Sequence, residues 1–108
     1  MKILNSILEA IGNTPLVRLN KISNSGEADI LVKCEYLNPS GSIKDRIALG
    51  MIQEAEKSGK IKGEHPTIVE ASTGNTAIAI SFVCVQLRVI KQLCLCLKAG
   101  QQRTELEF

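Results

Sequence analysis

The sequence predicts an α/β fold with a parallel sheet, and the order of its segments is the main reason. Two short apolar strands, at residues 30–35 and 67–70, are each followed by a turn of small polar residues and then by a helical pattern. A strand, turn and helix repeated in this order is the βαβ arrangement of a parallel sheet. The 108 residues suffice for one domain at most, because domains commonly span about 100–150 residues.

The N-terminal third is expected to hold a helix and two extended segments. Apolar residues at helical spacing predict a helix over residues 3–11, which Gly12 and Asn13 end. Residues 16–19 alternate as an extended segment, and the polar residues 20–27 are typical of a surface loop. The strand at 30–35 begins with a nearly continuous apolar run, which predicts burial on both faces as in a parallel sheet.

The middle of the chain is expected to hold two helices. Ser42 is a suitable N-cap for the first, Asp45 is an acidic first-turn residue, and Ser58 with Gly59 ends it. The second helix starts at about Thr76, after the strand at 67–70. One face of the first helix is expected to be apolar, because its apolar residues follow the 3.6-residue period: Ile43, Ile47, Ala48, Met51, Ile52 and Ala55.

Composition and charge exclude several classes of partner. The chain is 44% hydrophobic and 22% charged, with a formal net charge of +2. A charge this small argues against nucleic acid or an anionic membrane surface. No apolar run reaches the roughly 18–20 residues of a membrane span, and no secretory leader is recognisable, so we expect a cytoplasmic protein.

The cysteines and the histidine predict no metal site. Cys34, Cys84, Cys94 and Cys96 form no C-x-x-C pair, and the single histidine, His65, stands apart from them in a surface loop. We therefore expect reduced thiols.

The turn at residues 38–46 holds the first candidate for chemistry. Lys44 stands in the first turn of a helix, where the helix dipole disfavours a cation. A locally positive environment lowers the pKa of a lysine towards the neutral amine that a Schiff base requires. The alternative is a solvated lysine that happens to follow an N-cap, and the spacing by itself favours that alternative.

The turn at residues 72–76 holds the second candidate. Its hydroxyls, its carboxamide and the free N–H groups of a helix start are suited to bind a carboxylate or a phosphate. The alternative is a capped turn in which Gly74 serves only a left-handed backbone conformation.

Three segments of the chain, taken together, resemble the pyridoxal-phosphate enzymes of the cysteine synthase and cystathionine β-synthase family. They are Ile11-Gly12-Asn13-Thr14-Pro15-Leu16-Val17, Asn38-Pro39-Ser40-Gly41-Ser42-Ile43-Lys44-Asp45-Arg46 and Glu70-Ala71-Ser72-Thr73-Gly74-Asn75-Thr76. The similarity covers roughly residues 1–84 and is greatest to cysteine synthase. It implies a parallel-sheet fragment of a fold-type II enzyme, similar to tryptophan synthase β, from the smaller of two domains.

The resemblance also implies residue roles. Lys44 would attach the cofactor as a Schiff base and act as acid and base at the substrate Cα, while Asn75 would hydrogen-bond the cofactor ring oxygen. Ser72, Thr73 and Thr76, with the backbone at Gly74, would hold the carboxylate of an amino-acid substrate. Ala77 departs from the family pattern, because the family has glycine at that position.

The family's cysteine synthases make L-cysteine from O-acetylserine and sulfide, and complete members are homodimers. The chain contains neither the glycine-rich loop for the cofactor phosphate nor the later hydroxyl that pairs with the pyridine nitrogen, so we expect an N-terminal fragment without activity. The alternatives are a cystathionine β-synthase-like or other β-eliminating enzyme, and a non-catalytic fragment that binds a full-length homologue.

Residues 85–108 diverge from the family. A legal choice of codons for residues 85–92, read two nucleotides later, gives Ala-Ala-Lys-Gly-Tyr-Lys-Ala, which is similar to the expected continuation. We therefore hypothesise that this tail is frame-shifted. The alternative is an amphipathic segment that extends the second helix through Ile90 or forms a new strand from Leu93 to Leu97.

Overall fold

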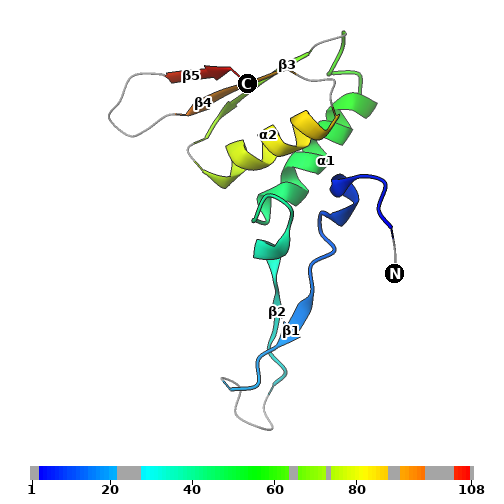
Figure 1. Cartoon of the computed structure of the whole chain (residues 1–108), viewed down its shortest axis with the longest axis vertical. Coiled ribbons are helices and arrows are strands. Elements are labelled where there is room, and N and C mark those ends of the chain that lie inside the picture. Colours follow the sequence, from blue (N-terminus) through cyan, green and yellow to red (C-terminus); the bar gives the residue numbers. More distant parts are fainter. Residues whose placement is uncertain are drawn as a thin grey trace.

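The computed structural model describes residues 3–21, 28–63, 66–72 and 74–87, and the backbone of residues 91–96 and 104–107. The elements follow one another as η1 (Ile7–Ala10), β1 (Leu16–Arg18), β2 (Leu31–Lys33), η2 (Glu35–Leu37), α1 (Lys44–Lys57), β3 (Thr67–Ala71), α2 (Asn75–Leu87), β4 (Lys91–Cys96) and β5 (Thr104–Glu107). The η elements are 3-10 helices. Figure 1 shows α1 and α2 in the middle of the molecule, between a three-stranded sheet and a two-stranded one.

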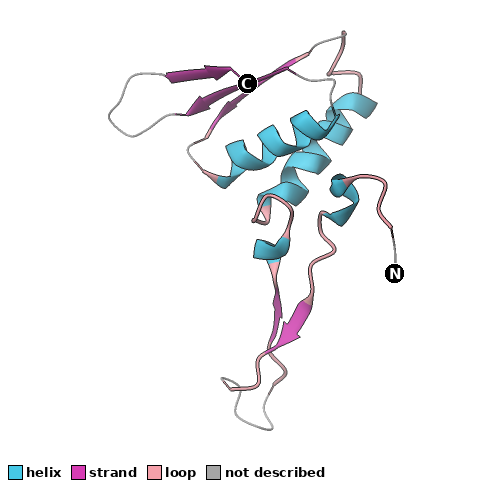
Figure 2. Ribbon diagram, in the orientation of Figure 1, coloured by secondary structure: helices cyan, strands magenta, loops and turns pink. Residues whose placement is uncertain are grey.

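The three-stranded sheet contains the βαβ unit. β3 and β4 run parallel, with Thr67 opposite Lys91 and Ala71 opposite Leu95, and α2 connects them. β5 then pairs antiparallel with β4, which gives the strand order β3-β4-β5 (Figure 2). The α/β class is confirmed, although the sheet is mixed. The parallel pair is β3 with β4, not the two strands that the sequence suggested.

The prediction of a strand buried on both faces at residues 30–35 is wrong. β2 spans Leu31–Lys33, pairs antiparallel with β1, and all three of its residues are exposed. The sequence shows only that these residues are apolar, whereas burial depends on what packs against them. The β1–β2 sheet extends away from the helices, as Figure 1 shows, so the described residues leave its faces uncovered.

The helix observed near the N-terminus is also shorter than the one that the apolar spacing predicted over residues 3–11. Only the four residues of η1 are helical, and Ile3 is 88% exposed. The Ser6 hydroxyl accepts a hydrogen bond from the Leu8 N–H at 3.2 Å and so fixes where η1 starts. Gly12, with φ +82°, then turns the chain, as its residue type predicted.

Helix α1 begins and ends close to the predicted positions. Its first residue is Lys44, and Ile43 occupies the N-cap position. The Ser42 hydroxyl, one residue earlier than Ile43, accepts the Lys44 N–H at 3.1 Å, so this serine makes the expected capping bond. Gly59, at φ +67°, follows its last turn. The predicted apolar face is buried only in part: Ala48 and Ile52 are buried, whereas Ile43, Ile47 and Met51 are 43–50% exposed.

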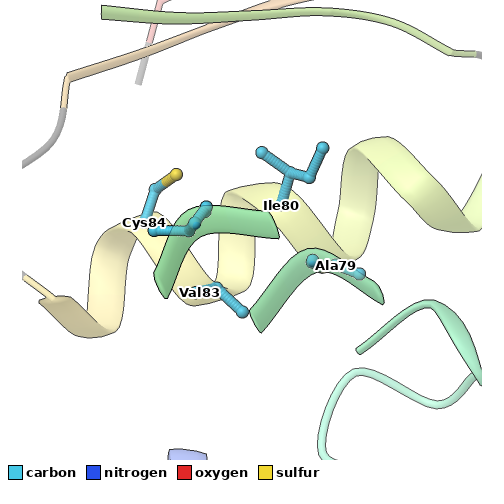
Figure 3. Packing of buried hydrophobic residues seen from close by; sticks show 6 residues of the cluster. Ala79, Ile80, Val83 and Cys84 are labelled. Carbon is cyan, nitrogen blue, oxygen red and sulfur yellow. The ribbon is translucent and has the colours of Figure 1, made fainter. Parts of the chain in front are cut away.

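The core lies where α1 packs on α2. Six buried residues form it: Ala48, Ile52, Ala79, Ile80, Val83 and Cys84. Figure 3 shows Ile80 and Cys84 projecting from one side of α2, as residues four positions apart do. Burial raises the pKa of the Cys84 thiol to about 11, so this cysteine stays protonated near neutral pH.

The tail contains a strand. α2 ends at Leu87, and β4, at Lys91–Cys96, covers residues 93–96 of the strand expected over residues 93–97. Leu97 lies outside the described residues. Residues 22–27 of the expected surface loop, His65, and residues 88–90 lie outside the described residues. No helix in the described part of the chain is long and apolar enough to cross a membrane.

Candidate functional site

Lys44 is the first residue of α1, in the predicted position, and the residue is half-buried. Among the described residues, none forms a hydrogen bond or an ion pair with its ammonium group. Its backbone is fixed by the bond to Ser42, which is itself buried. The amine is therefore attached to an ordered backbone while its own polar group has no protein partner in the described structure.

A buried carboxylate holds the turn that leads to Lys44. Asp45 is fully buried and accepts two hydrogen bonds from Ser40, one from the backbone N–H at 2.7 Å and one from the hydroxyl. Both bonds close the loop that contains Gly41, which adopts φ +90°. Asp45 also lies in the first turn of α1, where the helix dipole favours a negative charge.

An ion pair that the sequence analysis did not identify lies beside this turn. The Arg46 guanidinium donates from Nε to Glu35 Oε2 at 2.8 Å and from Nη2 to Glu35 Oε1 at 2.9 Å, a bidentate arrangement. The hydrogen bond from Arg46 is the main cause that lowers the pKa of Glu35 to about 2, and the same contact raises the pKa of Arg46. The sequence contains one signal for this ion pair. A cation in the first turn of a helix is disfavoured by the helix dipole and is therefore expected to have an acidic partner.

Asn38 and Gly12 extend this pair into a network. Asn38 is buried, and its side-chain N–H groups donate to the backbone carbonyl and to Oε2 of Glu35, both at 2.8 Å. Its Oδ1 accepts the Gly12 N–H at 2.8 Å, and the Gly12 carbonyl accepts from Arg46 Nη2 at 2.8 Å. The N-terminal segment, the residues after β2 and the start of α1 are thus joined at one place.

The second predicted turn joins β3 to α2. The half-buried Ser72 hydroxyl accepts the Gly74 N–H at 3.3 Å, Thr76 is half-buried, and Asn75 is exposed as the first residue of α2. Thr73 lies outside the described residues. Gly74 is not in the left-handed region, and a Cβ there would meet nothing within 4 Å. The alternative that Gly74 serves only a left-handed turn is therefore wrong.

The two turns lie at the starts of two helices that pack together. In the view of Figure 1, α1 and α2 both begin towards the same end of the helix pair. Among the described residues, no hydrogen bond or ion pair joins Lys44 to the second turn. Ala77 is buried in α2.

A separate apolar cavity of about 250 Å³ lies at the other half of α1. Its lining includes none of the predicted site residues and consists of Met51, Ile52, Ala55, Ile61, Ile68, Glu70 and Ile80. Within the described ranges, no group of three histidine, cysteine, aspartate or glutamate side chains is placed to hold a metal ion.

Comparison with known proteins identifies the family. The profile of the pyridoxal-phosphate dependent enzymes matches residues 7–101, which is most of the chain. The chain belongs to this family. It is 52% identical over 83 residues to the cysteine synthase of Staphylococcus aureus, which is 77% of the chain and 26% of that enzyme. It is also 52% identical over 82 residues to cystathionine β-synthase of Mus musculus, covering 74% of the chain and 14% of that enzyme.

Solved structures of family members share the fold. O-ureido-L-serine synthase superposes with a TM-score of 0.76 at 40% identity, over 86% of this chain and 28% of that one. A hydrogen sulfide-producing enzyme from Fusobacterium nucleatum gives the same TM-score and identity, over 93% of this chain and 33% of that one. The predicted resemblance and the fold-type II α/β class are confirmed. The chain spans about a quarter to a third of these cysteine synthase-like relatives.

Proposed function

We propose that this chain carries the lysine-bearing part of a cysteine synthase, an enzyme that makes L-cysteine from O-acetylserine and sulfide. The proposal rests on Lys44, a half-buried residue at the start of α1 whose amine makes no hydrogen bond or ion pair with a described residue. It belongs to a chain 52% identical to a cysteine synthase over 83 residues. A primary amine that is ordered through its backbone and free at its tip is what covalent attachment to an aldehyde requires.

The chemistry of the available groups fits pyridoxal phosphate. Lys44 offers the amine for the aldehyde, and the exposed Asn75 offers a carboxamide for the ring oxygen. Ser72, Thr76 and the N–H groups at the start of α2 offer donors for a substrate carboxylate, with the backbone at Gly74 and with Thr73 as further members. No glycine-rich run occurs in the 108 residues, so no group is assigned to the phosphate.

Each group of the chain has a definite task in the proposed reaction. When bound, the cofactor supplies an electron sink for the substrate Cα. Lys44 removes and returns the proton at that carbon, and this requires the amine to lie within about 3 Å of it. The hydroxyls and N–H groups of the second turn hold the carboxylate and so orient the Cα bond that reacts.

The 108-residue chain by itself is proposed to be inactive. It aligns with 26% of the S. aureus enzyme, and it has no glycine-rich run to which the cofactor phosphate could be assigned. We expect no L-cysteine from O-acetylserine and sulfide when the purified chain is mixed with pyridoxal phosphate. Measurable turnover under those conditions would contradict this part of the proposal. In a complete enzyme of this family we propose a homodimer.

Cystathionine β-synthase chemistry is the second candidate, because the identity to the mouse enzyme is also 52%. The two reactions differ in the thiol that is added, and this chain contains no residue that we can assign to that choice. A third role, binding to a full-length homologue without catalysis, is supported by the exposed apolar residues of the β1–β2 sheet, such as Leu16 and Leu31. Co-purification with such a homologue tests it.

Covalent trapping tests the assignment of Lys44. The full chain is incubated with pyridoxal phosphate, the lysine–cofactor bond is reduced with borohydride, and the modified lysine is found by peptide mass spectrometry. We expect Lys44 to be modified in preference to Lys57, the control at the other end of the same helix. Equal modification of both lysines would refute the proposed site, and a Lys44→Arg variant should lose the preferred modification.

A further inference from the structure

Glu35 is the centre of the network beside the lysine turn. Its carboxylate receives two hydrogen bonds from Arg46, one from Asn38 and a longer one, at 3.4 Å, from the Thr14 hydroxyl. The Glu35 side chain is 19% exposed and that of Arg46 is 38% exposed, so the pair is partly shielded from water. Pairs of this bidentate, partly buried kind hold geometry better than single exposed ion pairs.

The partners of Glu35 stand on both sides of the lysine turn. Asn38 precedes the turn, and Arg46 follows Lys44 by two residues in the first turn of α1. Both also bind the backbone of Gly12, one at its N–H and one at its carbonyl. The distance between the two ends of the turn is therefore set by one carboxylate and by the backbone of one residue, Gly12.

The space around Gly12 shows how closely the network is packed. A Cβ at this position would lie 2.7 Å from Arg46 Nη1 and 3.1 Å from Arg46 Cζ. The guanidinium therefore rests directly on the Gly12 backbone, and its position is fixed from two directions, by Glu35 and by Gly12.

We propose that Glu35 is a positioning residue for Lys44, which it orients through Arg46 and Asn38 without touching the cofactor or the substrate. The proposal rests on the proposed function only in that Lys44 is taken as the reactive amine. Glu35→Gln keeps one acceptor oxygen but replaces the other with an NH2 group, so Arg46 loses its bidentate contact and keeps its bond to the Gly12 carbonyl. The first turn of α1 therefore gains freedom. The surroundings of the Lys44 amine then change while the helix-pair core, which Glu35 does not touch, remains.

The first measurement follows the reactivity of each lysine and needs no cofactor. The full chain is treated with limiting acetic anhydride, and acetylation is measured for each lysine by mass spectrometry, in wild type and Glu35→Gln. We expect the Lys44 rate, relative to that of Lys57, to change by about three- to tenfold, because hydrogen bonds to a charged group are removed. An unchanged ratio would overturn the inference.

A matched control separates this effect from a general loss of an ion pair. Asp29 forms an exposed ion pair with Arg18, the last residue of β1, and Figure 1 shows β1 away from α1. Asp29→Asn makes the same change from acid to amide and should leave the ratio of Lys44 to Lys57 unchanged. Far-UV circular dichroism checks that each variant is folded. If Glu35→Gln is unfolded, Arg46→Lys, which keeps the charge but loses the bidentate geometry, should alter the same ratio.

The cofactor experiment distinguishes failure of this inference from failure of the proposed function. If wild-type Lys44 is not preferentially trapped with pyridoxal phosphate, the proposed function fails, whereas the acetylation ratio still decides the role of Glu35. If Lys44 is trapped equally well in wild type and Glu35→Gln, the positioning role is overturned and the function stands. We expect the preference for Lys44 to fall in Glu35→Gln and to persist in Asp29→Asn.

Discussion

The clearest test of the structure around the candidate site is the removal of the charge from Asp45. Its carboxylate is fully buried and receives both the N–H and the hydroxyl of Ser40. In Asp45→Asn, the remaining oxygen can accept the Ser40 N–H, and the new amide can donate to the Ser40 hydroxyl oxygen. The side chain thus keeps its shape and both contacts, and it loses the charge.

The expected loss of stability follows from that difference. Hydrogen bonds to an ionised acceptor are roughly twice as strong as neutral ones, so Asp45→Asn should lower the free energy of unfolding by about 1.5 kcal/mol. Asp45→Ala leaves the Ser40 N–H without its acceptor and opens a small cavity, so about 3 kcal/mol is expected. Ser40→Ala removes only the hydroxyl bond, which should cost about 1 kcal/mol.

Urea unfolding of the full chain at neutral pH, followed by far-UV circular dichroism, measures these values. Glu54→Gln is the control, because Glu54 is an exposed acid on the same helix and its loss should change stability by less than about 0.5 kcal/mol. If Asp45→Asn is as stable as wild type, or more stable, the buried carboxylate does not hold the turn. The same conclusion follows if Asp45→Ala and Glu54→Gln give equal effects.

Three further predictions concern the network and the core. Gly12→Ala should destabilise the chain by about 2–3 kcal/mol, because alanine is strained at φ +82° and its Cβ would displace the Arg46 guanidinium; urea unfolding measures it, and a neutral change would contradict the packing. Val83→Ala, at a fully buried position in the helix pair, should cost about 2 kcal/mol in the same assay, and a loss below about 0.5 kcal/mol would mean that the pair is not packed. The pKa of Glu35 is lowered from 4.5 to about 2 in the folded chain, so the unfolded state takes up the proton first and the stabilisation by this group is lost as the pH falls. The difference in the free energy of unfolding between wild type and Glu35→Gln should therefore have its maximum value above about pH 5 and decrease towards pH 2. A difference that does not vary with pH would contradict the lowered pKa.

The two helices were predictable because their signals are local. Ser42 supplies the cap bond and Gly59 the left-handed residue after the last turn, and both effects operate within a few residues. The strand at β3 and the start of α2 were predictable for the same reason, since an apolar run is followed by a polar turn. The position of Lys44 at the start of α1 follows directly from these local rules.

The burial of β2 could not be predicted, because it depends on contacts between distant segments. Its apolar run fits a buried strand, but whether anything covers the strand is decided elsewhere in the chain. The same holds for the helix expected at residues 3–11, which is reduced to η1. Apolar periodicity indicates which face would be buried, whereas a partner surface decides whether it is.

The Glu35 network joins residues too far apart for a sequence pattern to show. Glu35 and Arg46 are separated by 11 positions, and Gly12 and Arg46 by 34. One indirect signal existed, because two cations at 44 and 46 stand in the first turn of a helix, where the dipole disfavours both. The acid that pairs with Arg46 is the first residue of η2, two positions after β2 ends.

The three consecutive charged residues at the start of α1 face different surroundings, and this contrast bears on the role of the lysine. Successive helical residues are turned by about 100°, so Asp45 can point inward to Ser40 while Arg46 reaches Glu35. The ion pair offsets the unfavourable position of Arg46 at the positive end of the helix dipole. Lys44 has the same unfavourable position, and no described acid compensates for it. Lys44 as a whole residue is half-buried. We propose that it is kept for a bound partner, and trapping at Lys44 with Lys57 as the internal control decides between this role and that of a solvated lysine that merely follows the cap.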